Sequence, residues 1–362
     1  MEQSFYLEYV HKYFPLLVTQ IIERVNEKRG PLSYLYKGLL TPKFSADSRW
    51  ASVLAEYTRV AADVVTMDSP LPVKSRDSIE VAHGDIPKMG MKLGMTEKQM
   101  KDLDSMIAQG LPINQVLVSM FADLPRCIEG VWETIEGLFL SELSTGCGLA
   151  DRGAGVGVRV NVGFFPANQF ACTAAWAANP TTATPLDDIQ KVFDKALDDQ
   201  NVITDAWTDD YTLRALYNSK QVREQFAFNQ GIAVSSASVV PVLDFDKVGA
   251  IFLTKWQCRL HRVARKIKTE VNGVKNSYSP WQEGIISFTC DEKLGKLVWT
   301  NTVEASRPVP GVEYQTADQF ILLSRYSVND PLQEFTSSQA MVVPVLDNVD
   351  RIYTIDGKTP AA

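Results

Sequence analysis

The stretch INQVLVSMFADLPRCIEGVWETIEGLFLSELSTG, residues 113–146, decides the fold more than any other part of the chain. Its apolar residues recur close to the 3.6-residue period of a helix: Ile113, Leu117, Met120, Leu124, Ile128, Val131, Ile135, Leu138 and Leu143. We expect Pro125 to kink this helix. A continuous helix over 113–144 would be roughly 45 to 50 Å long. That exceeds what a compact domain needs, so the stretch predicts a spine.

The segment before the spine helix has a different pattern. ADVVTMDSPLPVKSRDSIEVAHGDIP, residues 62–87, contains short β-prone runs interrupted by Pro70, Pro72 and Pro87. Proline excludes a helix interior and favours edge strands or extended arms. The segment therefore predicts a long extended hairpin with little core of its own, which would suit an assembling subunit better than a monomeric enzyme.

Further helices are predicted before the spine helix. Aromatic and aliphatic residues at helical spacing over 5–29 predict one or two amphipathic helices, broken near Pro15. Their apolar stripe must be covered, either by the same subunit or by a neighbour. Thr96 and Gln99 form a capping-box pattern that opens a helix running to about Ile107.

The second half of the chain is richer in strands. A glycine-rich turn at 146–157 precedes alternating valines over 156–162, which predict a strand. Thr184 and Pro185 start a helix whose apolar face includes Leu197, and another helix is expected around 208–225. Asn272–Gly273 predicts a hairpin, and Asp291–Gly295 a second one between IISFTC and KLVWT. Strands at 320–326, 341–346 and 351–355 complete a mixed α+β architecture.

Composition excludes several classes of protein. The 362 residues carry a net charge of −7, so the basic excess of a tight DNA-binding protein is missing. The five cysteines, Cys127, Cys147, Cys172, Cys258 and Cys290, form no CxxC pair, which argues against zinc and disulfide frameworks. Acidic residues interrupt the first apolar stretch, against a signal peptide. No apolar run approaches the length of a membrane span.

No catalytic, cofactor-binding or metal site is predicted. His11, His83 and His261 are far apart in sequence and form no recognisable triad. GAGVGV at 153–158 has the spacing GxGxG and precedes a strand, whereas a nucleotide loop precedes a helix. DFDKVG at 244–249 lacks the later ligands of a calcium loop. Adjacent acids such as Asp187/Asp188, Asp198/Asp199 and Asp209/Asp210 are expected at helix starts and in solvated turns.

One basic stretch allows two interpretations. KWQCRLHRVARKIK, residues 255–268, carries six Lys and Arg residues and no acid. It could contact nucleic acid or an acidic neighbour. Alternatively, it is a solvated face behind Trp256, Leu260, Val263 and Ile267, which lie at helical spacing. The pattern does not decide between helix and strand.

Several stretches, taken in order, resemble the HK97-like capsid fold, specifically the lambda-type major capsid protein family (capsid protein E). They cover most of residues 55–356 and are ADVVTMDSPLPVKSRDSIEVAHGDIPKM (62–89), ETIEGLFLSELSTG (133–146) with VGVRVNVGF (156–164), NVITDAWTDDYTLRALYNSKQVR (201–223), SPWQEGIISFT (279–289) with LGKLVWT (294–300), and MVVPVLDNVDRIYTIDG (341–357). Residues 1–50 match nothing in the family pattern, and no residue is singled out for the Lys–Asn crosslinks of some members.

The resemblance implies a domain plan. The N-terminal arm would span 1–67 and the extended loop 68–94, and the peripheral domain with the spine helix would span 95–165. The axial domain would span 166–300, the return strands of the peripheral domain 301–336, and the C-terminal axial segment 337–362. The extended loop would lie over a neighbouring subunit.

The resemblance also implies a function and partners. The chain would not be an enzyme. It would assemble with itself as hexamers and pentamers into the icosahedral shell of a tailed-phage virion, made in the host bacterial cytoplasm. The shell would enclose double-stranded DNA without binding a specific sequence. No membrane partner is expected. Scaffold, portal and decoration proteins would be further partners. The alternatives are an encapsulin-type compartment enclosing a cargo enzyme, and a hydrolase using Asp or Glu pairs.

Overall fold

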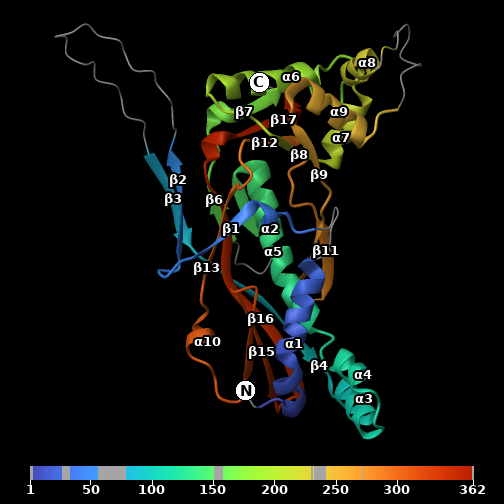
Figure 1. The fold of residues 1–362 in the computed structure, drawn as a ribbon, viewed down its shortest axis with the longest axis vertical. Helices are drawn as coiled ribbons and strands as arrows, with labels where there is room; N and C mark the ends of the chain where they lie inside the picture. Colours follow the sequence, from blue (N-terminus) through green and yellow to red (C-terminus); the bar gives the residue numbers. More distant parts are fainter. Residues whose placement is uncertain are drawn as a thin grey trace, which may run out of the picture. The chain divides into compact units, whose positions relative to one another are not determined.

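A computed structural model describes residues 3–26, 33–55, 79–150, 158–229, 231, 242–271 and 273–360 (Figure 1). The chain divides into two compact units, each built from separate stretches of sequence. Unit 1 comprises Met1–Trp50, Gly84–Leu138 and Lys296–Pro344, and unit 2 comprises Ala51–His83, Phe139–Gly295 and Val345–Ala362. Both units combine helices with sheets, which confirms the predicted α+β class.

A six-stranded sheet organises unit 1. Its order is β1 (Leu40–Phe44), β13 (Gly295–Thr300), β16 (Gln333–Leu346), β15 (Ile321–Val328) and β14 (Glu313–Ala317), with β4 (Lys88–Met95) also paired to β16. The pairs β14–β15, β15–β16 and β16–β4 are antiparallel. Residues 88–94, the end of the predicted extended loop 68–94, are therefore part of a strand of this sheet.

The helices of unit 1 are α1 (Leu7–Asn26), α2 (Leu35–Leu39), α3 (Glu97–Ala108), α4 (Ile113–Met120), the first part of α5 (Leu124–Thr145) and α10 (Val303–Ser306). The predicted capping box of α3 is confirmed, because the Thr96 side chain accepts from Gln99 N and the Gln99 side chain accepts from Thr96 N. This reciprocal pair satisfies two backbone donors of the first turn.

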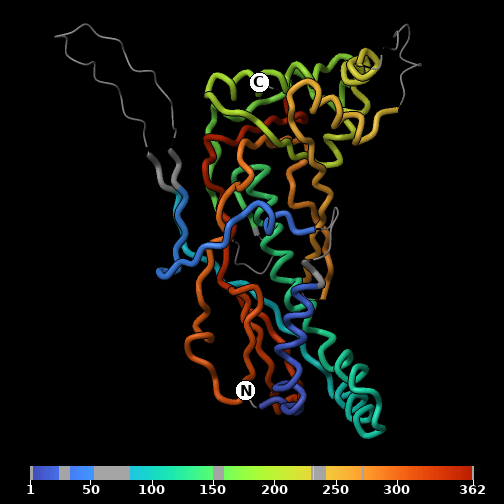
Figure 2. The backbone as a smooth tube through the Cα atoms, in the orientation of Figure 1, coloured from blue at the N-terminus to red at the C-terminus, as the bar shows by residue number. Residues whose placement is uncertain are grey.

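The predicted break near Pro15 is wrong. Helix α1 runs through Pro15 without interruption and lies alongside the strands of the unit 1 sheet (Figure 2). Its inner face buries Val10, Phe14 and Val18, each at most 3% exposed. Proline in a helix interior costs about 3 kcal/mol. Burial of three such side chains, at about 1.5 to 3 kcal/mol each, outweighs that cost.

The predicted single spine over 113–144 is also corrected. Helix α4 ends at Met120, a turn occupies 121–123, and α5 begins at Leu124. Pro125 thus lies in the first turn of α5, where its missing N–H breaks no helical hydrogen bond. The 22 residues of α5 give a helix about 33 Å long.

Unit 2 is organised by a five-stranded mixed sheet. Its order is β7 (Gln169–Cys172), β17 (Ile352–Pro360), β12 (Ile285–Thr289), β8 (Asp205–Asp209) and β9 (Arg259–Val263). The outer pairs β7–β17 and β8–β9 are parallel, and the inner pairs are antiparallel. Trp176, Ile189, Phe252, Phe288 and Tyr353, all fully buried, form the centre of its core.

The helices of unit 2 are α6 (Pro185–Asp198), α7 (Asp210–Asn218), α8 (Lys220–Asn229) and α9 (Phe245–Trp256), and short 3-10 turns lie at Pro166–Asn168 and Val349–Arg351. Pro185 occupies the first turn of α6, as predicted. Leu197 was expected on the apolar face of α6, but its side chain is 72% exposed.

Three other predictions in unit 2 are corrected. The helix expected around 208–225 is strand β8 followed by two helices that meet at Ser219. The glycine-rich turn contains strand β5 (Cys147–Ala150), which pairs with β6 (Val158–Asn161). The hairpin expected around 291–295 does not form, because β12 pairs with β17 and β8 whereas β13 joins the other sheet.

The hairpin predicted at Asn272–Gly273 is confirmed by its two strands and by Gly273, while Asn272 is outside the described residues. Strands β10 (Ile267–Val271) and β11 (Val274–Tyr278) are antiparallel, with Val271 opposite Val274 and a left-handed φ of +78° at Gly273. Glycine adopts this conformation without the steric cost of a Cβ. Strands β2 (Arg49–Ala55) and β3 (Ile79–Asp85) form another two-stranded sheet. Residues 56–78, which include 68–78 of the predicted extended loop, are outside the described residues.

Candidate assembly surface

His261 forms a short contact with a carboxylate, as the base of a catalytic dyad would. Its Nε2 lies 2.6 Å from Asp205 Oδ1. The same carboxylate also accepts from Arg259 Nη2 at 2.9 Å and from Thr204 Oγ1 at 2.7 Å, and the imidazole stacks on Trp207. Burial raises the pKa of Asp205, but these hydrogen bonds outweigh burial and lower it overall. The cluster links β8 to β9. No Ser or Cys among the described residues forms a hydrogen bond with His261.

The other two histidines lie elsewhere. His11 on α1 faces Glu313 on β14 at 3.3 Å, and His83 is exposed on β3. Within the described ranges, no group of three or more His, Cys, Asp or Glu side chains could hold a metal ion. Asp244 caps α9 by accepting from Lys247 N. The GAGVGV stretch, except Val158, is outside the described residues.

The acid pairs have structural roles. Asp209 caps α7, and Asp210 forms an ion pair with Arg262 of β9. Asp188 lies in the first turn of α6 as predicted, but it is buried, not solvated. Its carboxylate accepts from Thr173 and from Trp176 Nε1. These contacts give the buried charge the partners that it needs.

The basic stretch 255–268 combines the end of α9, strand β9 and the start of β10. Leu260, Val263 and Ile267 are buried, as the apolar spacing predicted, although the stretch is mainly strand and not helix. Arg259 and Arg262 pair with Asp205 and Asp210 of the same unit. Lys266 and Lys268 are exposed. Much of the basic charge is therefore neutralised within the subunit.

The N-terminal segment is anchored on unit 1. Glu334 of β16 accepts from Ser4 Oγ, and from Phe5 N at 3.3 Å, while Ser327 Oγ donates to Gln3 O at 2.7 Å. Tyr6 OH donates to Asp104 Oδ1 at 2.9 Å. The apolar residues Val10, Phe14 and Val18 of α1 are buried within the same chain, whereas Leu16 is exposed. The sequence interpretation missed this anchor, because the residues around Glu334 (QEFTSSQ, 333–339) are mostly polar and give no sign of burial.

Ribbons of only two strands occur in the described part of the chain. Within the described residues, β2 pairs only with β3 and β10 only with β11. All five residues of β11 are exposed, including Val274 at 60% and Tyr278 at 40%. An isolated two-stranded ribbon is marginally stable in water, and its unpaired edges and faces are suited to a further partner.

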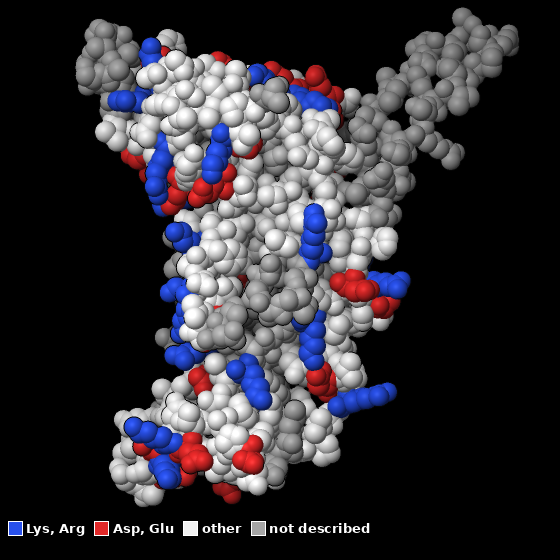
Figure 3. Space-filling model, turned by 180° about the vertical axis from the view of Figure 1, so that it is seen from behind, with Lys and Arg blue, Asp and Glu red and all other residues white. Residues whose placement is uncertain are grey.

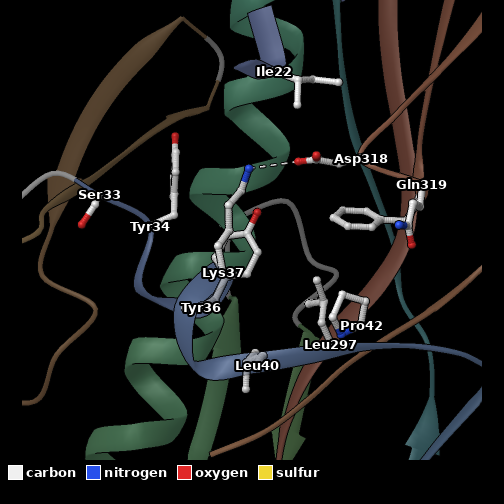
Figure 4. A pocket seen from close by; sticks show the side chains of 12 residues that line it. Ile22, Ser33, Tyr34, Tyr36, Lys37, Leu40, Pro42, Leu297, Asp318 and Gln319 are labelled. Atoms are coloured by element: carbon white, nitrogen blue, oxygen red, sulfur yellow. Dashed lines mark hydrogen bonds and ion pairs between the residues drawn. The ribbon is translucent and has the colours of Figure 1, made fainter. Parts of the chain in front are cut away.

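A pocket of about 700 Å³ lies in unit 1 at the end of α2 (Figure 4). Lys37 Nζ points into it, 3.0 Å from Asp318 Oδ2 and 3.6 Å from the centroid of the Trp132 ring. Burial lowers the pKa of Lys37, and the charge of Asp318 opposes this effect. Asp318 and Gln319 both have left-handed backbones, with φ of +47° and +67°. The ion pair joins α2 to the β14–β15 turn.

Two comparisons with known proteins found no relative. No family model matches the chain, and no curated protein matches it. Among the described helices, none is both long enough and apolar enough to cross a membrane.

Solved structures do match. The chain resembles the crystal structure of a protein assigned as the capsid protein of a prophage of E. coli CFT073, with a TM-score of 0.57 and 12% identity over 94% of this chain and 98% of that chain. A phage-related protein of Bordetella bronchiseptica RB50 matches at a TM-score of 0.49 and 9% identity over 95% and 98% of the two chains. The mature capsid of bacteriophage PhiM1 matches at 0.47 and 10% over 91% and 89%.

The fold is therefore that of phage capsid proteins. It agrees with the HK97-like fold that the order of sequence motifs predicted.

Proposed function

We propose that this chain is the major capsid protein of a tailed phage or prophage, with no catalytic role. It self-assembles as hexamers and pentamers into an icosahedral shell that encloses double-stranded DNA. The observation that carries the proposal is the likeness to the prophage capsid protein, which extends over 94% of this chain and 98% of that chain.

The proposed domain roles follow the family plan. The peripheral domain is 95–165 with the return strands 301–336, and the axial domain is 166–300 with the segment 337–362. The two discontinuous units support a plan of this kind, since each also collects separate stretches of the chain. The loop 68–94 remains the candidate for contact with a neighbouring subunit. Its end is anchored, because strand β4 pairs with β16 of the unit 1 sheet.

The charge distribution supports a shell that contains DNA without gripping it. The net charge is −7. On the face drawn in Figure 3, Lys and Arg side chains are interspersed with Asp and Glu and form no continuous basic surface. Tight DNA binding requires many phosphate contacts from one basic surface. Scaffold, portal and decoration proteins are further partners in this proposal.

The proposal is tested by expressing the full chain, with any adjacent scaffold gene, and examining the product by size exclusion and negative-stain microscopy. Rings, tubes or closed shells are expected. Particles recovered from phage-producing cells should contain nuclease-protected double-stranded DNA. Particles that contain a cargo enzyme and no DNA would favour the compartment instead. A discrete monomer with measurable turnover would contradict both.

A further inference from the structure

Unit 2 carries a basic region at one edge of its sheet. Strand β9 is the last strand in the sheet order, and within the described residues it pairs only with β8. Arg262 of β9 forms an ion pair with Asp210. The hydrogen bond from Arg262 lowers the pKa of the Asp210 carboxyl, and the charges of Arg214 and Lys266 lower it further. Three cations therefore act on this one carboxylate. We call Arg214, Arg262 and Lys266 the basic edge.

An apolar surface adjoins the basic edge. Tyr278 lies opposite Ile267, the residue after Lys266, in the β10–β11 ribbon. Its side chain is 40% exposed, and Val274 on the same strand is 60% exposed. Stable protein interfaces combine an apolar centre with a charged or polar rim. The basic edge and this ribbon together have that composition.

Helix α6 carries the opposite charge. Asp187, Asp194 and Asp198 are exposed along it. Its two lysines are already paired, Lys191 with Asp188 and Lys195 with Asp199. Leu197 directly precedes Asp198 in sequence, and Val202 follows it by four residues. Their side chains are 72% and 71% exposed. We call Asp187, Asp194 and Asp198 the acidic helix face, which also has apolar residues next to it.

The two surfaces are separate within one subunit. Helix α6 packs on β7 and β17, and Tyr353 OH of β17 donates to Asp199 at the end of the helix. In the sheet order, β12 and β8 lie between β17 and β9. Three strand spacings amount to about 14 Å. This exceeds the screening length of about 8 Å at physiological salt, so the two surfaces neutralise each other little inside one subunit.

We propose that the basic edge of one copy docks on the acidic helix face of the next copy, so that unit 2 associates head to tail. Two different surfaces of opposite charge on one chain make a heterologous contact, which closes into a ring when the rotation between copies permits. The occupant is a second copy of this chain because the chain itself supplies the complementary charge. This inference rests on the proposed function and specifies one interface of the proposed assembly.

Charge reversal tests the inference on exposed residues that pair with no buried acid. The variant Arg214→Glu/Lys266→Glu makes both surfaces acidic, and Asp194→Lys/Asp198→Lys makes both basic. Each should reduce the fraction of assembled particles about tenfold or more, since like charges across an interface cost several kcal/mol. Circular dichroism and the melting temperature confirm that each variant is folded.

The matched control is the quadruple variant with all four reversals, whose net charge equals that of the wild type. It should assemble like the wild type because the two surfaces are complementary again. An equimolar mixture of the two double variants should also associate, as acidic and basic copies alternate. If the folded double variants assemble like the wild type, or if the quadruple variant fails while the wild type assembles, the inference is wrong. A wild-type chain that stays monomeric overturns the proposed function together with it.

Discussion

Arg325 Nε lies 2.9 Å from Glu334 Oε1, and both side chains are only 1% exposed. The pair links β15 to β16 in unit 1, and both side chains also contact other segments of the unit. Arg325 Nη1 donates to Met120 O at the end of α4, while Glu334 accepts from Phe5 N. One buried ion pair thus joins the start of the chain, the end of a helix and the centre of a sheet.

Glu334→Gln should destabilise unit 1 by about 3 to 5 kcal/mol, because it leaves the Arg325 charge buried without its counter-ion. Urea unfolding measured by fluorescence gives the value. Asp85→Asn is the control, since Asp85 is 90% exposed and 3.7 Å from Arg49. It should change the free energy of unfolding by less than about 0.5 kcal/mol. Equal effects of the two substitutions would show that burial of the Arg325–Glu334 pair is unimportant.

Asp205→Asn should lower the free energy of unfolding at pH 7. It should also make this free energy depend less on pH in the acidic range. The folded-state pKa of Asp205 is lowered by its hydrogen bonds with Arg259 and His261, against the effect of burial. Its contribution is therefore present above the unfolded-state pKa of about 3.9 and is lost as pH falls through the folded-state pKa. Urea unfolding between pH 2 and pH 7 measures this. Asp198→Asn, at an exposed position, is the control, and identical pH profiles for all three proteins would refute the assignment.

Glu142→Gln should have the opposite dependence on pH. Glu142 is fully buried, and neither carboxylate oxygen has a hydrogen-bond partner among the described residues. Burial raises its pKa well above the usual value. As pH rises above about 4.3, Glu142 ionises in the unfolded chain but stays protonated in the folded chain. The free energy of unfolding of the wild type then falls by up to about 1.4 kcal/mol per pH unit. The free energy of unfolding of the variant, relative to that of the wild type, should therefore increase as pH rises. Parallel profiles from pH 4 to pH 8 would mean that Glu142 is ionised in the folded state.

Gly90→Ala should destabilise unit 1 by about 1 to 3 kcal/mol through overpacking. A Cβ at Gly90 would lie 2.1 Å from the carbonyl oxygen of Ser338, so that β4 could not keep its pairing with β16. Gly38→Ala is the matched control in the same unit, because nothing lies within 4 Å of the added Cβ in α2. It should be neutral or stabilising by up to about 1 kcal/mol. Thermal melts of the two variants should shift in different directions or by clearly different amounts.

Local signals in the sequence predicted local structure well. The Thr96–Gln99 capping box and the Asn272–Gly273 turn each depend on residues close together in the chain, and both are confirmed. The break at Pro15 was mispredicted because the burial of α1 on a distant sheet outweighs local propensity. The pairing of β12 was mispredicted for a similar reason, since its partners β17 and β8 lie far from it in sequence.

The surfaces argued to act in assembly were only partly predictable. The sequence revealed the basic stretch around Arg262 but not its pairing with Asp210, which is 52 residues away and is brought near by the parallel β8–β9 pair. The same strand pairing creates the Asp205–His261 contact. Neither contact has a local signal, because strand partners are set by the buried faces of the whole sheet.

The most direct test of the central claim is sedimentation velocity of the purified full-length chain, with negative-stain images of each sedimenting species. Measurements at several salt concentrations, with and without the adjacent scaffold gene product, cover the conditions under which shells form. The account predicts rings or closed shells of many copies sedimenting far ahead of the 40.3 kDa subunit. A folded chain that sediments only as a monomer under every condition would contradict it.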